Sequence, residues 1–343
     1  IEAMKGLIEH GTKAQKLAAS YYNQTLFDDS FKIQMAKKVV LEETEDLELV
    51  AAFFKAFDLK TSSHIQNLLY DRTNNQQIER KTPKIPTVTD YFESREDAEN
   101  QYQKFVEIFS RLPKKGLVFS PCIFPWYQVS LSPSEVVCQM AFTAYVLQDE
   151  DKITKAAEHL GEAEGYSRRN LMTLLLHSPK NQRQREMLIG YMGNAESGTS
   201  KRAIELVKRL KLESQDFVWM EHMLRFKRSG LRGELIRFLM TQSEKDMPAC
   251  LERLLTDKLE EKREAGLDML LRLSKSESKK VLYEKTKVLA EKIERPTDKE
   301  KILIQEIVGG EKTDHTEKKG NGIYDPEAPF EILEPKMEKE WKD

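Results

Sequence analysis

The sequence predicts an all-α protein, most of which is a stack of helical repeats. From Ser134 to about Val308, apolar residues recur at spacings of three and four, and Gly and Pro are nearly absent from segment interiors. The predicted helices form groups of three that begin at Ser134, Arg183 and Leu231. A period of about 48 residues is typical of stacked repeats, because each unit has an apolar face that only a neighbour can bury. The alternative is an ordinary globular helical domain with coincidental spacing.

The N-terminal region, residues 1–112, is also predicted to be mostly helical, with a less regular pattern. Apolar spacing indicates an antiparallel pair of helices over 31–43 and 47–57, followed by a helix near 63–70. A further helix is predicted at 95–111, where a serine precedes the first turn as an N-cap and aromatic residues form one stripe.

Three other segments depart from the helical pattern. Residues 73–89 are polar and contain two prolines, which predicts a loop or linker. Residues 113–133 contain four prolines among the apolar runs LVF, CIF and WYQVSL, which predicts an extended, aromatic-rich connection ahead of the repeats at 134–308. After the repeats, residues 309–343 combine a polar linker with an extended, apolar C-terminal arm.

The third helix of each predicted repeat can be superposed on the others without gaps. This alignment predicts that the superposed side chains all face the core, Trp219 and His222 included. The superposed positions are Leu171, Leu174 and Leu175, then Trp219, His222 and Met223, then Leu267, Leu270 and Leu271.

Composition argues against a membrane-spanning protein and a disulfide-rich protein, and it favours a reducing compartment. The 343 residues include 55 Lys and Arg, 57 Asp and Glu, and no apolar run long enough to span a membrane. Three widely separated cysteines, with no CxxC, argue against a disulfide framework and predict a reducing, cytoplasmic location. The chain opens in a helix-like pattern without an initiator Met, so we expect it to be an internal region of a larger protein.

No motif for catalysis, cofactor binding or metal binding emerges from the sequence. There is no GxxxxGK[ST] loop, no GxSxG elbow and no cysteine in a recognisable nucleophile context. The six histidines are scattered, and none pairs with another at the HxxxH spacing of metal ligands. We therefore predict a non-enzymatic region without cofactor or metal, with any active site in another domain.

Charge is distributed unevenly along the chain. Residues 166–237 have a net charge of +8, whereas residues 1–165 carry −6 and residues 238–343 carry −4. Many of the central basic residues lie near predicted helix ends, which in a stacked array line up along one edge or the concave face. The candidate binding residues are Arg168, Arg169, Arg183, Arg185, Lys208, Arg209, Arg225, Lys227, Arg228 and Arg232.

Such a basic centre has three possible interpretations. It can bind an acidic protein partner or an acidic part of the same chain, or it can bind the phosphates of a nucleic acid. It can also be a solvated surface without a partner. No membrane partner is expected.

The segment LERLLTDKLEEKREAGLDMLLRLSKSES, residues 251–278, resembles a HEAT-type repeat, and the neighbouring units are similar to it more loosely. With the later stretch KKGNGIYDPEAPFEI, the repeats look similar to large bacterial proteins of the molybdate-metabolism-regulator-like family. These carry helical repeats ahead of a C-terminal domain of unknown function. The resemblance implies a HEAT/armadillo-like α-solenoid within a multidomain cytoplasmic protein, and it brings no catalytic residue.

The sequence thus predicts an interaction scaffold whose basic centre selects an acidic protein partner or another domain. The main alternative is that the basic central repeats bind nucleic acid, and one form of this alternative is binding of the kind seen in HEAT-like DNA glycosylases. Those enzymes need an aromatic and an acidic residue beside the basic groove, and Trp219 with Asp216 is the nearby candidate pair.

Overall fold

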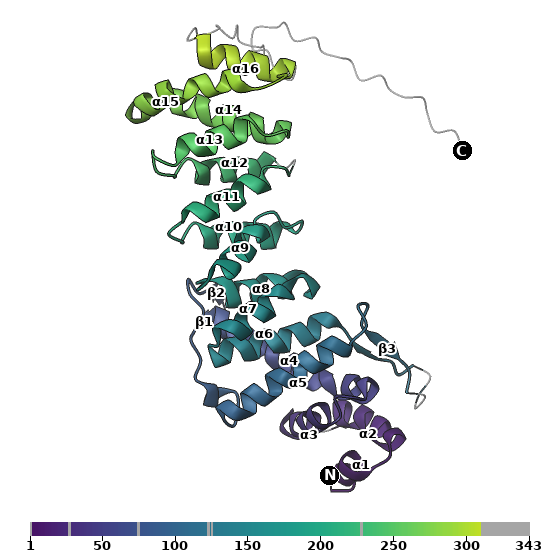
Figure 1. The fold of residues 1–343 in the computed structure, drawn as a ribbon. Helices are drawn as coiled ribbons and strands as arrows, with labels where there is room; N and C mark the ends of the chain where they lie inside the picture. The colour runs from purple at the N-terminus through teal and green to yellow at the C-terminus, as the bar shows by residue number, and fades with distance from the viewer. Residues whose placement is uncertain are drawn as a thin grey trace, which may run out of the picture. The chain divides into compact units, whose positions relative to one another are not determined.

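The computed structural model describes residues 2–26, 29–73, 76–121, 124, 126–226 and 229–309. The chain divides into two compact units, residues 1–247 and 248–343. The described part of each unit is mostly helical, as the sequence predicts (Figure 1). The division falls inside the range 134–308 that the sequence assigns to repeats.

The N-terminal helices pack around α4, the longest helix described. Asp46 caps α4, because its Oδ1 accepts hydrogen bonds of 3.2 Å from the backbone N–H groups of Glu48 and Leu49. α4 contacts α2, α3, α6 and α8, and it buries a continuous apolar face. The helices are α1 (Glu2–His10), α2 (Lys13–Leu26), α3 (Asp29–Glu42) and α4 (Leu47–Leu69).

The prediction of separate helices over 47–57 and near 63–70 is wrong, because α4 is continuous through both. No Gly or Pro interrupts the intervening residues. Their buried positions, Phe57, Thr61, Ile65 and Leu68, keep the helical spacing. Tertiary burial therefore maintains the helix through a stretch of weak helix formers.

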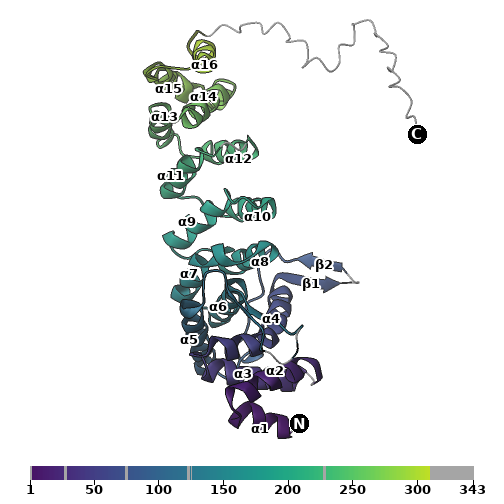
Figure 2. The same ribbon diagram turned by 90° about the vertical axis from the view of Figure 1, so that its right-hand side faces the viewer.

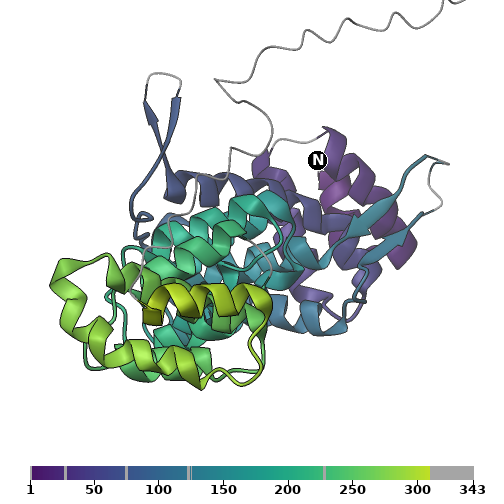
Figure 3. The same cartoon turned by 90° about the horizontal axis from the view of Figure 1, so that it is seen from above.

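Two antiparallel β-ribbons interrupt the helices of the first unit and reach out from them (Figure 3). β1 (Tyr70–Thr73) pairs with β2 (Gln76–Glu79), so part of the predicted loop at 73–89 is a strand. A short 3₁₀ turn, η1 (Val88–Asp90), follows. Within the predicted connection at 113–133, β3 (Leu117–Phe119) pairs with β4 (Val129–Leu131). Pairing satisfies the backbone groups that an isolated extended segment would leave to water.

The helix predicted at 95–111 is confirmed as α5 (Arg95–Arg111). Its N-cap is Ser94, whose Oγ accepts a 3.1 Å hydrogen bond from the backbone N–H of Asp97. The buried face, which includes Tyr102 and Phe105, packs against α6.

From α7 onward, the helices of the first unit recur in pairs at a constant interval. α7, α9 and α11 begin at 150, 182 and 214, and α8, α10 and α12 begin at 165, 197 and 229. We call this spacing the helix-pair interval. The elements are α6 (Pro133–Leu147), α7 (Glu150–Glu158), η2 (Leu160–Glu162), α8 (Gly165–Leu176), α9 (Gln182–Tyr191), α10 (Ser197–Val207), α11 (Ser214–Met223) and α12 (Ser229–Leu239).

Buried positions repeat at the helix-pair interval too. Leu160, Met192 and Leu224 take equivalent places in successive pairs and are all buried, as are Leu171, Ala203 and Leu235. α9 packs against both α7 and α11, and α8 packs against α10. Figure 2 shows α7, α9 and α11 on one side and α8, α10 and α12 on the other. The structural unit is therefore a pair of helices, one in each of two layers.

The helix-pair interval is shorter than the three-helix period that the sequence predicts. One three-helix step equals one and a half pairs, so it superposes α8 on α11, a helix of the other layer. The prediction that His222 faces the core is consequently wrong: His222 is exposed and Trp219 is only half-buried. The buried positions of α11 include Phe217, Met220 and Met223.

The second unit is also built from short helices. Its carboxylate Glu300 is fully buried, and the guanidinium Nε of Arg263 lies 2.9 Å from its Oε1. The described elements here are α13 (Met247–Leu255), α14 (Glu260–Ser274), η3 (Glu277–Lys279), α15 (Lys280–Thr286), η4 (Lys287–Lys292) and α16 (Asp298–Gly309).

Residues 310–343, which contain the predicted C-terminal arm, lie outside the described residues. Among the described residues, no helix is both long enough and apolar enough to cross a membrane.

Substitution of Leu224 by Ala tests the register of the helix pairs. Leu224 is 1% exposed, so Leu224→Ala should lower the free energy of unfolding by about 2–5 kcal/mol, the usual cost of a cavity at a buried leucine. His222→Ala, close by in sequence but exposed, should stay within about 0.5 kcal/mol of the parent protein. Chemical denaturation measures both. Equal losses of unfolding free energy in the two variants would contradict this register and favour the three-helix alignment.

Asp58 on α4 gives the stability a pH dependence. Burial, together with the carboxylate of Glu135, raises the pKa of Asp58 to about 6, although Lys55 opposes the shift. A raised carboxyl pKa stabilises the fold below the unfolded value, and this contribution is lost as the pH rises through about 6. Asp58→Asn should therefore stabilise the protein by about 1–2 kcal/mol at pH ~7.5, after allowance for solvent screening, and much less at pH ~4.

Thermal unfolding at the two pH values measures this difference. Asp151→Asn, which changes an exposed carboxylate on α7, is the matched control and should show no comparable gain. A gain for Asp58→Asn that is as large in acid as at neutral pH would show that the ionised carboxylate is not its cause.

Candidate functional site

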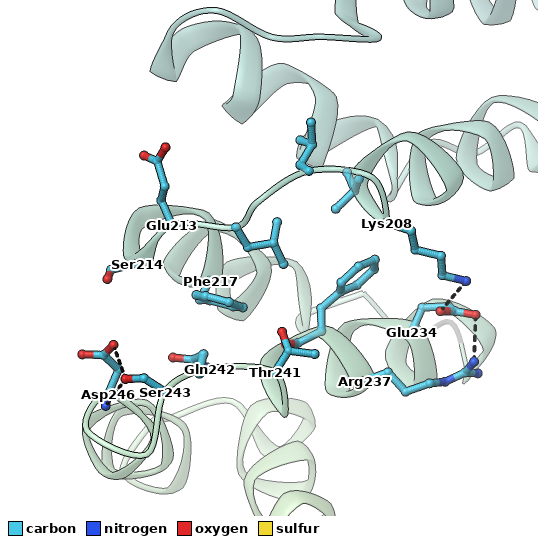
Figure 4. Close-up of a pocket in the computed structure, with 14 residues that line it drawn as sticks. Lys208, Glu213, Ser214, Phe217, Glu234, Arg237, Thr241, Gln242, Ser243 and Asp246 are labelled. Carbon is cyan, nitrogen blue, oxygen red and sulfur yellow. Dashed lines mark hydrogen bonds and ion pairs between the residues drawn. The ribbon is translucent and has the colours of Figure 1, made fainter. Parts of the chain in front are cut away.

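A groove of about 710 Å³ opens in the first unit between two neighbouring interhelical turns. The turn at 208–213 joins α10 to α11, and the turn at 240–246 follows α12. Figure 4 shows side chains from both turns and from the adjoining helix ends facing this space. The two turns occupy equivalent places in successive helix pairs.

The floor of the groove is apolar. Phe217 on α11 and Phe238 on α12 both line it and are 8% and 7% exposed, and Val207 at the end of α10 is fully buried. In Figure 4, Phe217 points from α11 toward Thr241 and Gln242. The Gln242 Nε2 donates a 3.1 Å hydrogen bond to the Leu239 carbonyl oxygen. The floor is thus a preformed surface on which an apolar side chain can rest.

One end of the groove carries two cations that share one carboxylate. The Lys208 Nζ lies 3.3 Å from the Glu234 Oε2, and the Arg237 Nη1 lies 3.2 Å from the Glu234 Oε1 (Figure 4). The side chains of Lys208 and Arg237 are 50% and 63% exposed. Because one carboxylate faces two cations, this end keeps a net positive charge.

The opposite end of the groove is acidic. The Ser243 Oγ donates a 2.7 Å hydrogen bond to the Asp246 Oδ2, and the Asp246 backbone N–H donates to the same Oγ at 3.2 Å. The exposed carboxylate of Glu213 lies on the same side in Figure 4. The groove therefore has a positive end and a negative end, which gives it a direction.

Arg168 and Arg169, at the start of α8, both bind other parts of the chain: Arg168 binds a turn and Arg169 binds a strand. The guanidinium of Arg168 donates hydrogen bonds of 2.6–3.2 Å to three carbonyl oxygens of the turn before α8. The Arg169 Nη2 lies 2.9 Å from the Glu79 Oε2 at the end of β2.

Arg183 and Arg185 on α9 are paired with carboxylates. Arg183 is exposed and bridges Glu158, at 3.0 Å, and Glu186, at 2.9 Å. Arg185 is largely buried, with its Nε 3.0 Å from the Asp216 Oδ1 and its Nη2 bonded to the other carboxylate oxygen. The hydrogen bond from Arg185 to Asp216 raises the pKa of the guanidinium further.

The remaining predicted residues are dispersed. The exposed Arg209 donates a 2.6 Å hydrogen bond to the carbonyl oxygen of Lys81, and the guanidinium of Arg225 lies 5.0 Å from the centroid of the Phe226 ring. Arg232 is half-buried on α12. Lys227 and Arg228 lie outside the described residues. Of the predicted residues that the structure describes, Lys208 is the one that lines the groove.

Several residues that matter here are not among the ten candidate binding residues, although Arg202 and Arg237 belong to the basic stretch 166–237. Arg202, only 4% exposed, lies 2.8 Å from the Glu79 Oε1, so one carboxylate on β2 joins Arg169 of α8 to Arg202 of α10. The ribbon that carries Glu79 has no clear signal in the sequence. Phe217, Glu234 and Arg237 could have been found from an alignment at the helix-pair interval, which places successive turns side by side.

Asp216, the acidic member of the Trp219–Asp216 pair that a glycosylase-like site would need, has a structural role. Asp216 is 1% exposed, pairs with Arg185, and accepts a 2.7 Å hydrogen bond from the backbone N–H of Glu213 at the start of α11. Its carboxylate caps the helix and neutralises a largely buried arginine.

Within the described ranges, no group of three or more His, Cys, Asp and Glu residues is arranged to hold a metal ion. Cys138 and Cys250 are both buried.

Comparison with known proteins gives a family. The model of a family of unknown function (DUF5724) matches residues 1–343, and the chain belongs to that family. No curated protein and no solved structure matches the chain.

The Arg185–Asp216 pair gives a stability prediction for this region. Asp216→Asn leaves a largely buried guanidinium with only the exposed carboxylate of Glu213, 3.8 Å from its Nη1, and should lower the free energy of unfolding by about 3 kcal/mol. Glu205→Gln removes the exposed partner of Arg202, whose other anion Glu79 remains, and should cost less than about 1 kcal/mol. Denaturant titration compares the two variants, and an equal effect would show that Asp216 is a surface partner only.

Proposed function

We propose that this member of the DUF5724 family is an interaction scaffold that binds an acidic protein segment in the groove between the turns 208–213 and 240–246. The segment would come from a partner protein or from another domain of a larger protein. The observation that carries the proposal is an apolar floor flanked at one end by two cations that share one carboxylate.

The repeat architecture supports this proposal. Helix starts and buried positions recur together at the helix-pair interval, which favours a HEAT/armadillo-like α-solenoid. Proteins of that architecture use the edges and faces of stacked helices to bind extended partners. The groove lies at such an edge, where the chain crosses between layers.

The chemistry of the groove selects the partner. An apolar side chain of the partner would cover Phe217 and Phe238 and remove their residual exposed surface from water. A neighbouring carboxylate would supply the second anion that Lys208 and Arg237 lack. The exposed cations Arg209 and Lys211 in the same turn would strengthen the attraction for an acidic segment.

The acidic end of the groove would fix the direction of binding. Glu213 and Asp246 would repel a second carboxylate there, so the bound segment is expected to be acidic at one end and neutral or basic at the other. Repulsion at the wrong end supplies specificity that attraction alone does not.

The same proposal assigns the protein to the cytoplasm, as a non-enzymatic region of a larger molecule of the molybdate-metabolism-regulator-like type. Its support is the resemblance of residues 251–278 to a HEAT repeat and of the later KKGNGIYDPEAPFEI stretch to those proteins.

Peptide binding by the whole chain tests the proposal. The probe is a short fluorescein-labelled peptide with one Phe, Glu residues on one side and Ser on the other, and its control carries Gln in place of Glu. We expect the acidic peptide to bind, and the variant with both Lys208→Glu and Arg237→Glu to weaken it about tenfold or more, equal to ~1.4 kcal/mol. Lys114→Glu, an exposed cation between α5 and β3, is the matched control and should leave binding unchanged.

Equal binding of the Gln peptide, or no loss with the double reversal, would contradict the proposal. A short DNA duplex serves as the second probe. Duplex binding that weakens steeply with salt, without binding of either peptide, would favour the nucleic-acid alternative instead.

A further inference from the structure

A second cavity, of about 380 Å³, lies in the N-terminal half of the first unit and shares no lining residue with the groove. Residues of α3, α4, α5 and α6 surround it, together with the segment Thr89–Glu93 before α5. Its volume falls within the usual range of small-molecule sites. The cavity is therefore separate from the site of the proposed scaffold function.

Aromatic rings form the walls of this cavity. The Tyr91 ring lies 4.7 Å from that of His64 and 5.1 Å from that of Phe142, both measured between centroids. Phe142 is 3% exposed, whereas Tyr91 is half-buried and stands nearer the solvent. Walls of this kind favour a flat ring, which can stack on one face and meet the edge of another.

The cavity also contains a buried amide with an unused donor. Gln139 lines the cavity and is 2% exposed, and its Oε1 accepts a 2.8 Å hydrogen bond from the Thr61 Oγ1. The Gln139 Nε2 is buried and has no hydrogen-bond partner among the residues described. A buried N–H group without an acceptor is unfavourable. A ligand that brings an acceptor to this N–H would therefore gain binding free energy.

The interior of the cavity is close to neutral. The Lys37 Nζ is held by Glu93, at 2.9 Å, and by Asp97, at 3.1 Å. Burial, with a smaller contribution from nearby Lys60, lowers the pKa of His64 to about 4, so the imidazole is uncharged at neutral pH. Lys60, the other cation of the lining, has an exposed side chain, so a charged ligand would lose its hydration in the interior without a buried countercharge.

We propose that this cavity binds a small, uncharged aromatic or heteroaromatic ring bearing a carboxamide or lactam. The ligand carbonyl oxygen accepts from the Gln139 Nε2, and the ligand N–H can donate to the second lone pair of the Gln139 Oε1. The ring packs against Tyr91 and Phe142. The amide supplies orientation, and the rings supply the contact area.

Ligand-observed NMR and calorimetry on the full chain test this proposal with benzamide as the probe. We expect benzamide to bind with millimolar or better affinity, and both toluene, which lacks the amide, and benzoate, which is charged, to bind at least tenfold more weakly. Gln139→Met keeps the size of the side chain, removes the donor and should weaken benzamide at least tenfold. Gln242→Met in the groove is the matched control and should leave it unchanged.

Tyr91→Leu provides a second test, because Tyr91 is half-buried and its replacement is tolerable even if Gln139→Met does not fold. It should also weaken benzamide at least tenfold. Absence of benzamide binding to the parent chain, equal binding of toluene, or benzamide affinity unaffected by Tyr91→Leu would each overturn the proposal.

Discussion

Helices α7 to α12 depend on one constraint: a pair of short helices cannot bury its own apolar face. Leu160, Met192 and Leu224, which follow α7, α9 and α11, are fully or almost fully buried, and α9 packs against both α7 and α11. At the helix-pair interval, α7 meets α9, α9 meets α11, and α8 meets α10. The layers, the turns between them and the groove at the turns all follow from this spacing.

The same packing determines how the basic residues are used. Neighbouring pairs bring carboxylates next to cations that are distant in sequence, as with Arg185 and Asp216, or Arg169 and Arg202 around Glu79. These contacts use much of the positive charge of residues 166–237 within the fold. At the groove, the exposed cations Lys208 and Arg237 share the single carboxylate of Glu234.

The groove and the aromatic cavity present different chemistry. The groove is open, polar at both ends and formed by turns, which suits a segment of another chain. The cavity is lined by buried rings and one amide with an unused donor, which suits a small uncharged ligand. They have no lining residue in common, so binding at one can be tested with variants at the other as controls.

The helical class and most helix positions over 134–308 could be predicted from the sequence, because apolar spacing at three and four is a local property. The N-cap Ser94 and the helix that follows it were likewise legible from local signals. The period could not be read in the same way. A three-helix step aligns apolar stripes of helices in opposite layers, and the helix-pair interval aligns stripes of helices in one layer almost equally well. Tertiary packing, by contrast, leaves His222 exposed, places Glu79 between two arginines, and buries Gln139 with an Nε2 that has no hydrogen-bond partner among the described residues. Those outcomes depend on which elements pack together, and the pairing of distant segments is not encoded in the pattern of any one of them.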